Sequence, residues 1–89
     1  MNRYFTDTAD EDYKEWLKTN KRVFKKINDL LEDIEDNGFG KGLGKPERLK
    51  HFEEPTFSRR IDKLNRLVYR PYGDNDILIL SCKGHYQDK

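Results

Sequence analysis

A carboxylate, an imidazole and a guanidinium group in this chain form a set that can cleave RNA without a metal ion. Glu47 lies among basic residues in the stretch GKPERLKH (44–51), and His85 lies just beyond the last apolar segment. One of these two groups would remove the proton of a ribose 2′-OH and the other would protonate the leaving 5′-oxygen, while Arg66 would stabilise charge on the phosphorane. Tyr86, next to His85, is a fourth candidate. The hypothesis assumes that the fold brings these side chains together.

Basic and aromatic side chains accompany these candidates. The planar fork of arginine suits phosphate oxygens, and tyrosine rings can stack on the bases of single-stranded RNA. The same cations can equally form a solvated surface, His85 can be an ordinary surface or capping histidine, and Phe57 and Tyr69 can be core residues. The cations are Lys45, Arg48, Lys50, Arg59, Arg60, Arg66 and Arg70, and the tyrosines are Tyr69, Tyr72 and Tyr86.

Charge is distributed unevenly along this polar sequence. The chain has 89 residues, of which 39% are charged and 34% hydrophobic. Its five Tyr, five Phe and one Trp are too many for a typical disordered segment, so we expect one compact domain over residues 1–89. Residues 1–36 carry 7 Lys and Arg against 10 Asp and Glu, whereas residues 37–89 carry 11 against 7. The second half is therefore where a polyanionic partner is expected.

Several classes of site and protein are excluded by what the sequence lacks. Cys82 is the one cysteine, and no Cys/His cluster has the spacing of a zinc site. The first residues contain no apolar run of the kind found in signal peptides. The longest aliphatic run, ILIL (77–80), is far too short for a membrane span. We therefore expect a reduced, cytoplasmic protein that uses no metal, no cofactor and no membrane.

Apolar periodicity predicts two helices that form a hairpin. A capping-box pattern from Thr8 to Glu11 indicates the start of the first helix, the chain breaks near Asn20, and Gly38 ends the second helix. The predicted apolar faces are Ala9, Tyr13, Trp16 and Leu17 in the first helix and Phe24, Ile27, Leu31 and Ile34 in the second.

The rest of the chain predicts a sheet. Alternation and apolar runs indicate strands at 3–6, 47–52, 57–62, 65–71 and 76–82. The order β-α-α-β-β-β-β predicts an α+β domain, with the helical hairpin on one face of a mostly antiparallel sheet and the basic residues on the free face. The glycines between 38 and 44 predict a flexible loop. It is not a Walker loop, because five residues separate Gly38 from Gly44 and Pro46 follows Lys45.

Five segments carry a resemblance to a known family in their order and spacing. They are KRVFKKINDLLEDI (21–34), GKPERLKH (44–51), SRRI (58–61), NRLVYR (65–70) and CKGHY (82–86). Together they resemble the YoeB/Txe branch of the RelE/ParE toxin superfamily over nearly the whole chain. The stretch HFEEPTF (51–57) departs from that pattern, since relatives usually carry a loop that ends in Trp. Glu53 and Glu54 in this stretch add negative charge beside the proposed RNA groove.

The resemblance implies a RelE-like fold and the toxin of a type II toxin–antitoxin system. Such toxins are ribosome-dependent endoribonucleases, or mRNA interferases, which cut mRNA in the ribosomal A site without a metal ion and so inhibit translation. The resemblance further implies a YefM-type antitoxin whose disordered tail covers the toxin. Operator DNA would be bound only through the antitoxin complex, and a homodimer is expected.

The resemblance also implies a role for each candidate residue. Glu47 would be the general base, His85 the general acid, and Arg66 the cation that stabilises the transition state. Tyr86 would position the substrate or assist proton transfer. The residues expected to contact RNA are Lys45, Lys50, Arg59 and Arg60.

Two other functions remain open from the sequence. ParE-like members of the superfamily inhibit DNA gyrase through protein contacts and are not nucleases. A chain that acts only as an antitoxin or operator-binding partner would not be toxic. The presence of Glu47 and of the adjacent His85 and Tyr86 favours the nuclease.

Overall fold

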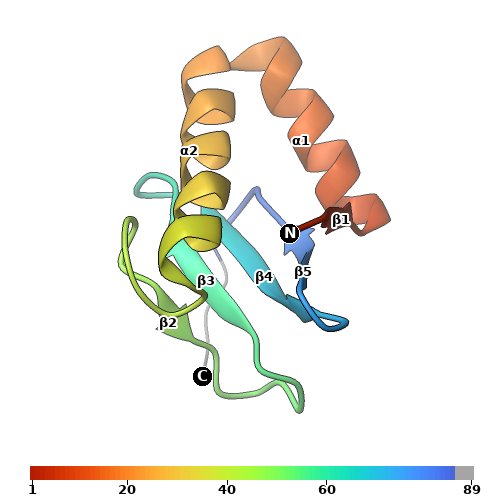
Figure 1. Cartoon of the computed structure of the whole chain (residues 1–89). Coiled ribbons are helices and arrows are strands. Elements are labelled where there is room, and N and C mark those ends of the chain that lie inside the picture. The colour runs from red at the N-terminus through yellow and green to blue at the C-terminus, as the bar shows by residue number, and fades with distance from the viewer. Residues whose placement is uncertain (86–89) are drawn as a thin grey trace.

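A helical hairpin covers one face of a five-stranded sheet (Figure 1). The computed structural model describes residues 1–85, and the elements follow the order β-α-α-β-β-β-β. The α+β architecture expected from the sequence is therefore confirmed. The elements are β1 (Arg3–Phe5), α1 (Asp7–Thr19), α2 (Lys21–Asn37), β2 (Glu47–Arg48), β3 (Phe57–Arg60), β4 (Arg66–Tyr72) and β5 (Asp76–Ser81).

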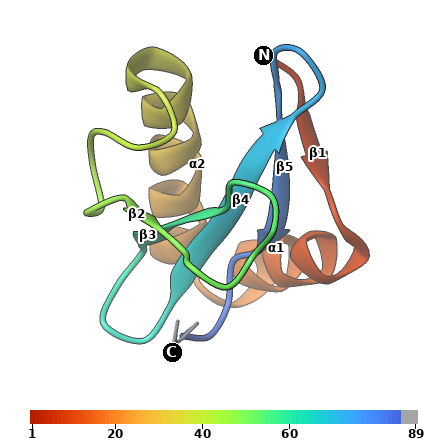
Figure 2. The same cartoon turned by 90° about the horizontal axis from the view of Figure 1, so that it is seen from below.

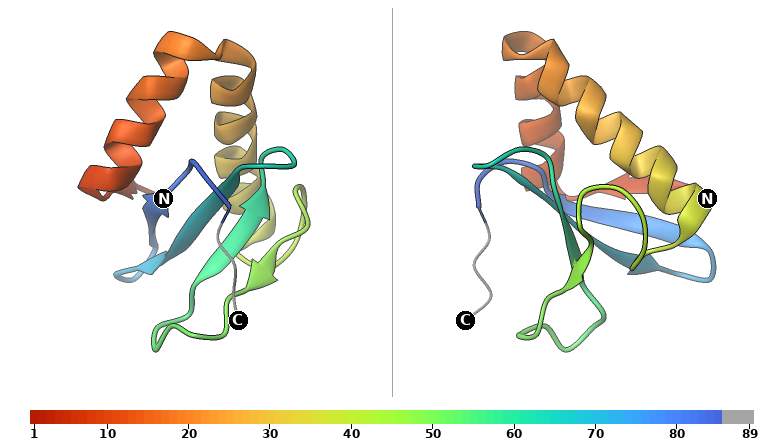
Figure 3. Two further views of the ribbon diagram at one scale, coloured as in Figure 1. Left: turned by 180° about the vertical axis from the view of Figure 1, so that it is seen from behind. Right: turned by 90° about the vertical axis from the view of Figure 1, so that its left-hand side faces the viewer.

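The sheet is mixed, with the strand order β1-β5-β4-β3-β2. β1 runs parallel to β5, and every other neighbouring pair is antiparallel. Both helices lie on one side of this sheet, and the loop over residues 49–56 extends on the other side (Figure 2, Figure 3). We call the side of the sheet opposite the helices the open face.

The core lies between the helices and the sheet, and α2 contributes most of it. α1 buries Ala9 fully and packs the partly buried Tyr13 and Trp16 against the core, whereas Leu17, which was predicted on this face, is exposed. Burial of one large aliphatic side chain contributes about 1.5–3 kcal/mol, so α2 anchors the hairpin more strongly than α1. The buried aliphatic residues are Val23, Ile27, Leu30, Leu31 and Ile34 from α2, and Ile61, Leu67, Ile77 and Ile79 from the sheet and its β3–β4 turn.

The start of α1 differs from the predicted capping box at Thr8. Thr6 is the N-cap, because its hydroxyl oxygen accepts a hydrogen bond from the Ala9 N–H at 3.1 Å. The same hydroxyl donates to the Leu80 carbonyl at 2.9 Å and so joins the helix to β5. Thr8 lies within the first turn of α1 and is exposed. The tertiary contact of Thr6 decides between two threonines that have similar local propensity.

The second helix begins where the first one ends. Asn20 donates its backbone N–H to the Trp16 carbonyl at 2.9 Å and accepts the Val23 N–H with its side-chain oxygen at 3.2 Å. One residue therefore caps both helices, and the break predicted there is confirmed. Trp16 also donates its indole N–H to the Cys82 carbonyl at 2.8 Å, which holds α1 against the end of β5.

The predicted strands 47–52 and 57–62 extend two or more residues beyond the observed ones. β2 has only two residues instead of the predicted 47–52. Just after this strand, the Leu49 N–H donates a hydrogen bond to the Thr56 carbonyl at 2.8 Å. β3 ends at Arg60 instead of 62, because Asp62 turns the chain. Its Oδ1 accepts the N–H groups of Leu64 and Asn65 at 2.9 and 2.8 Å, which is a typical Asx turn.

The open face is only partly free, contrary to the prediction. Val68 at its centre is buried although it lies outside the core between sheet and helices. The loop over residues 49–56 folds toward this face, since Glu54 pairs with Arg70 and the Arg70 guanidinium lies over the Phe52 ring. The basic residues that β3 and β4 present on this face are thus divided: Arg60 and Arg66 lie at its uncovered end and Arg70 at its covered end. Within residues 1–85, no helix combines the length and the apolar character needed to span a membrane.

The double role of Thr6 gives a stability prediction. We expect Thr6→Ala to lower the free energy of unfolding by about 1 kcal/mol or more, because it removes the cap and the bond to Leu80. Thr8→Ala is the matched control and should change it by less than about 0.5 kcal/mol. Urea denaturation followed by circular dichroism measures both values, and a larger loss for Thr8→Ala would contradict the observed cap.

Candidate active site

Arg59 lies inside the protein rather than on its surface. It is paired with Leu67 across the β3–β4 ladder, and both side chains point toward the helices. A guanidinium has five N–H donors, and here all five are used. Nε donates to the Tyr69 hydroxyl at 2.8 Å, Nη1 to Asp33 Oδ2 at 2.6 Å and the Leu43 carbonyl at 3.0 Å, and Nη2 to the carbonyls of Gly38 at 2.9 Å and Lys41 at 2.6 Å. The expectation that Arg59 contacts RNA is therefore wrong, because it has no donor left for a phosphate.

Asp33 of α2 balances the charge of this buried guanidinium. Its carboxylate accepts hydrogen bonds from Arg59, from the Leu43 N–H at 2.9 Å and from the Asn37 side chain at 2.8 Å. The bond from Arg59, followed by that from the Leu43 N–H, lowers the pKa of Asp33 below its ordinary value of 3.8. A buried charge without such a partner costs several kcal/mol, so the two residues depend on each other.

The same contacts fix the glycine-rich loop that the sequence predicted to be flexible. Tyr69 donates its hydroxyl to the Phe39 carbonyl at 2.5 Å, and burial raises the pKa of this hydroxyl. Gly42 has a φ of +115°, and a Cβ there would lie 1.9 Å from Asp33 Oδ2, so no larger residue fits without a shift. We call Arg59, Asp33 and Tyr69, with the loop carbonyls they hold, the Arg59 clamp.

The fixed loop leads directly to Glu47. The Arg60 N–H donates to the Gly44 carbonyl at 2.7 Å, which joins the end of the loop to β3. Glu47 then lies opposite Ser58 in the β2–β3 ladder. Since Ser58 alternates with Arg59, Glu47 belongs to the open face, where its side chain is exposed. The clamp therefore positions the strand that carries the candidate base.

Hydrogen bonds hold Gly84, the residue before His85, next to Arg66 and Asn65. The Arg66 N–H donates to the Gly84 carbonyl at 2.9 Å, and the Gly84 N–H donates to the Asn65 side chain at 2.8 Å. His85 follows directly and is exposed. The Arg66 guanidinium donates to the carbonyls of Asp62 at 2.7 Å and Asn65 at 3.1 Å, which restrict its direction. Tyr86, the fourth candidate, lies outside the described residues.

Arg60 joins these residues to Glu47. It pairs with Arg66 across the β3–β4 ladder, and it lies two residues from Ser58 on the same face. Glu47, Arg60 and Arg66 therefore share the open face: Glu47 lies in the row of Ser58 and Val68, and Arg60 and Arg66 form the next row on that face, at the end where Gly84 bonds to Arg66. Lys50 is exposed just after β2. That these side chains act together in one site stays a prediction.

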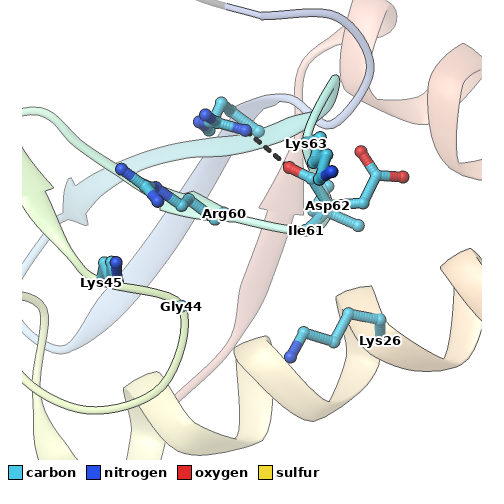
Figure 4. Close-up of a pocket in the computed structure, with 8 residues that line it drawn as sticks. Lys26, Gly44, Lys45, Arg60, Ile61, Asp62 and Lys63 are labelled. Carbon is cyan, nitrogen blue, oxygen red and sulfur yellow. Dashed lines mark hydrogen bonds between the residues drawn. The ribbon is translucent and has the colours of Figure 1, made fainter.

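A basic pocket of about 540 Å³ opens beside this region (Figure 4). Its lining includes Lys45, Arg60 and Arg66, which the sequence predicted, and also Lys26 of α2 and Lys63 of the β3–β4 turn, which it did not. No local pattern links a helix residue to a strand turn, so only the fold could reveal these two cations. One carboxylate, Asp62, belongs to the lining, and its carbonyl receives the hydrogen bond that is dashed in Figure 4. Neither Glu47 nor His85 lines this pocket.

Metal ligands do not cluster in the part of the chain that the structure describes. Within residues 1–85, no three His, Cys, Asp or Glu side chains form a group that could hold a metal ion. The polar groups at the open end of the sheet are instead a carboxylate, three basic side chains and a histidine. This set can exchange protons and attract phosphate oxygens.

Comparison with known proteins gives full-length matches. The family model described as YoeB-like toxin of bacterial type II toxin–antitoxin system matches residues 5–86. Toxin YoeB of Escherichia coli K12 is 42% identical over 86 residues, which cover 97% of this chain and 100% of that protein. The YoeB dimer from Staphylococcus aureus superposes with a TM-score of 0.90 at 48% identity, covering 97% of this chain and 98% of that one. The heterotetrameric YoeB–YefM complex from S. aureus gives a TM-score of 0.88 with the same identity and coverage.

The helical hairpin on a mixed sheet, together with sequence similarity to these toxins over almost the whole chain, defines the toxin component of a bacterial type II toxin–antitoxin system. Within that class, the chain belongs to the YoeB-like toxin family.

Arg59 and Arg60 are adjacent in sequence but should respond differently to the same substitution. We expect Arg59→Gln to lower the free energy of unfolding by about 3–5 kcal/mol, because it leaves Asp33 and the loop carbonyls without their donor. Arg60→Gln removes an exposed charge and should change it by less than about 0.5 kcal/mol. Urea denaturation tests the pair, and similar losses for both variants would show that Arg59 is not buried in solution.

The clamp also predicts how stability depends on pH. Because the pKa of Asp33 in the folded protein is below 3.8, its ionised form stabilises the fold above that value, and this contribution is lost as the pH falls through the folded pKa. Asp33→Asn should therefore destabilise the protein most at neutral pH, and the difference from wild type should shrink in acid. Asp36→Asn, at an exposed position of the same helix, is the control. A difference for Asp33→Asn that stayed constant with pH would contradict the assignment.

Proposed function

We propose that this toxin is a ribosome-dependent endoribonuclease that cuts mRNA in the ribosomal A site and so inhibits translation. The observation that supports the proposal is the hydrogen bond from the Arg66 N–H to the carbonyl of Gly84, the residue before His85, on a sheet whose open face also carries Glu47. A base, an acid and a phosphate-binding cation are the groups that such a cleavage needs. Action on the ribosome places the protein in the cytoplasm.

The proposed reaction uses only side chains and the RNA itself. Glu47 takes the proton of the ribose 2′-OH, and the 2′-oxygen forms a bond to the adjacent phosphorus. His85, as imidazolium, gives its proton to the 5′-oxygen as the bond between phosphorus and that oxygen breaks. The products are a 2′,3′-cyclic phosphate and a free 5′-hydroxyl. Tyr86 keeps the role implied by the family resemblance, which is to position the substrate or assist proton transfer.

The charges around these groups favour a phosphate substrate. Arg66 would donate to the oxygens of the phosphorane, and Lys45, Lys50 and Arg60 would bind neighbouring phosphates. General acid–base catalysis contributes about 10²–10⁴ in rate, and a well-placed charged donor contributes about 10²–10³. Arg60 and Lys45 line the basic pocket together with Arg66, which supports a role for them in binding the RNA backbone next to the scissile phosphate.

The proposed partners follow from the relatives. S. aureus YoeB occurs as a dimer and in a heterotetramer with YefM. We propose a homodimer and a YefM-type antitoxin for this chain as well. An antitoxin tail with acidic residues would compete with RNA for the basic end of the open face. Operator DNA would be bound through the antitoxin complex only.

Cleavage of mRNA in programmed ribosomes tests the proposal directly. Wild-type protein should cut A-site mRNA and leave a 2′,3′-cyclic phosphate or its hydrolysed form. His85→Ala and Arg66→Ala should each cut at least about 100-fold more slowly, because they remove the acid and the cation. Lys25→Ala is the control, since Lys25 is exposed on α2 and pairs with Asp29 there.

Two outcomes would contradict the proposal in different ways. If the His85→Ala and Arg66→Ala variants are folded by circular dichroism and both cut mRNA at the wild-type rate, the assigned catalytic residues are rejected. Inhibition of DNA gyrase by a wild-type protein that cuts no ribosome-bound mRNA would favour the ParE-like alternative. The Lys25 variant should behave as wild type in either assay.

A further inference from the structure

Arg70 occupies the covered end of the open face and is poorly satisfied there. It shares a face with Arg66, four residues earlier on β4, which corresponds to about 13 Å along the strand. Its side chain is 16% exposed, its Nη1 donates to Glu54 Oε1 at 2.5 Å, and its buried Nε has no acceptor within residues 1–85. Arg59 uses all five of its donors, whereas the Nε of Arg70 is a buried donor that no acceptor satisfies among the described residues.

Two exposed tyrosines lie on the same face beside Arg70. Arg70 and Tyr72 alternate along β4, and Tyr4 of β1 reaches the face through Leu78, which is paired with both Tyr4 and Arg70. The rings of Tyr4 and Tyr72 contact each other with centroids 5.2 Å apart. These side chains are 44% and 47% exposed, so a ligand can reach their rings. Exposed aromatic rings beside an arginine form the surface on which single-stranded nucleic acids stack.

We propose that Arg70, Tyr4 and Tyr72 hold a second nucleotide of the RNA substrate, and that Glu54 occupies Arg70 until a phosphate replaces it. The proposal rests on the proposed nuclease function and adds a subsite to it. RNA fits better than an acidic peptide, because its phosphate would pair with Arg70 while its base would use the ring faces that a carboxylate leaves empty.

A phosphate can displace Glu54 from Arg70. Its side chain is 69% exposed, so its ion pair with Arg70 is weak by the standard of buried pairs. It also lies on the loop 49–56, in which Phe52 packs under the Arg70 guanidinium at 5.6 Å. A phosphate at Arg70 would accept the Nη1 hydrogen bond that Glu54 now accepts, and movement of the loop would give access to Nε. The acidic residues of this loop would then limit RNA affinity instead of abolishing it.

Binding of a short fluorescein-labelled oligouridine to the whole protein, followed by fluorescence anisotropy, tests this subsite without ribosomes. Glu54→Gln should tighten binding more than Glu53→Gln, which changes the net charge equally at a neighbouring exposed position. The difference between the two should vanish when Arg70→Gln is also present. Tyr72→Leu should weaken binding about fivefold or more, since one stacked base is lost.

The outcomes separate this subsite from the nuclease. Equal effects of Glu53→Gln and Glu54→Gln, or wild-type affinity in Tyr72→Leu, would overturn the subsite, and Tyr72→Leu decides the case if Arg70→Gln does not fold. Binding of an acidic peptide at Arg70 in place of oligouridine would overturn it in favour of a protein partner. Weaker oligouridine binding by Tyr72→Leu and tighter binding by Glu54→Gln, together with no cutting of ribosome-bound mRNA by wild type, would support the subsite and reject the nuclease.

Discussion

The guanidinium of Arg59 is the group on which the candidate site depends. Its five hydrogen bonds join β3 to α2 through Asp33, to β4 through Tyr69, and to three carbonyls of the loop that leads to β2. β2 has only two residues and lies at the edge of the sheet, so its own ladder holds it weakly. The position of Glu47 is therefore set mainly by the buried contacts between the Arg59 clamp and the loop that precedes β2.

The four arginines of β3 and β4 have the same side chain but different roles, which depend on where the fold places them. Arg59 points toward the helices and is saturated by partners, whereas Arg60, its neighbour, points to the open face and lines the basic pocket. Arg66 is directed by two carbonyl oxygens, and Arg70 is held by a single exposed carboxylate. The number and burial of their acceptors, more than their place in the sequence, distinguish a structural arginine from one that can bind a phosphate.

Much of this fold could be predicted from the sequence, because helical and strand periodicities are local. The α+β order and the core face of α2 follow from such patterns, and the family resemblance gave the candidate residues. The cap at Thr6 could not be predicted, since its choice over Thr8 depends on Leu80 far along the chain. The error at Arg59 was avoidable: adjacent residues of one strand face opposite sides, so Arg59 and Arg60 could not both contact RNA. Lys26 and Lys63 had no local signal at all.

Amide hydrogen exchange tests the central claim, that the Arg59 clamp fixes the loop before the candidate base. In the wild type, the Leu43 and Arg60 amides should be protected, because they donate to Asp33 and to the Gly44 carbonyl. In Arg59→Lys, which keeps the charge but cannot make the five hydrogen bonds, both amides should exchange much faster while the Ile79 amide of β5 stays protected. Unprotected Leu43 in the wild type, or unchanged exchange of both amides in Arg59→Lys, would contradict this account.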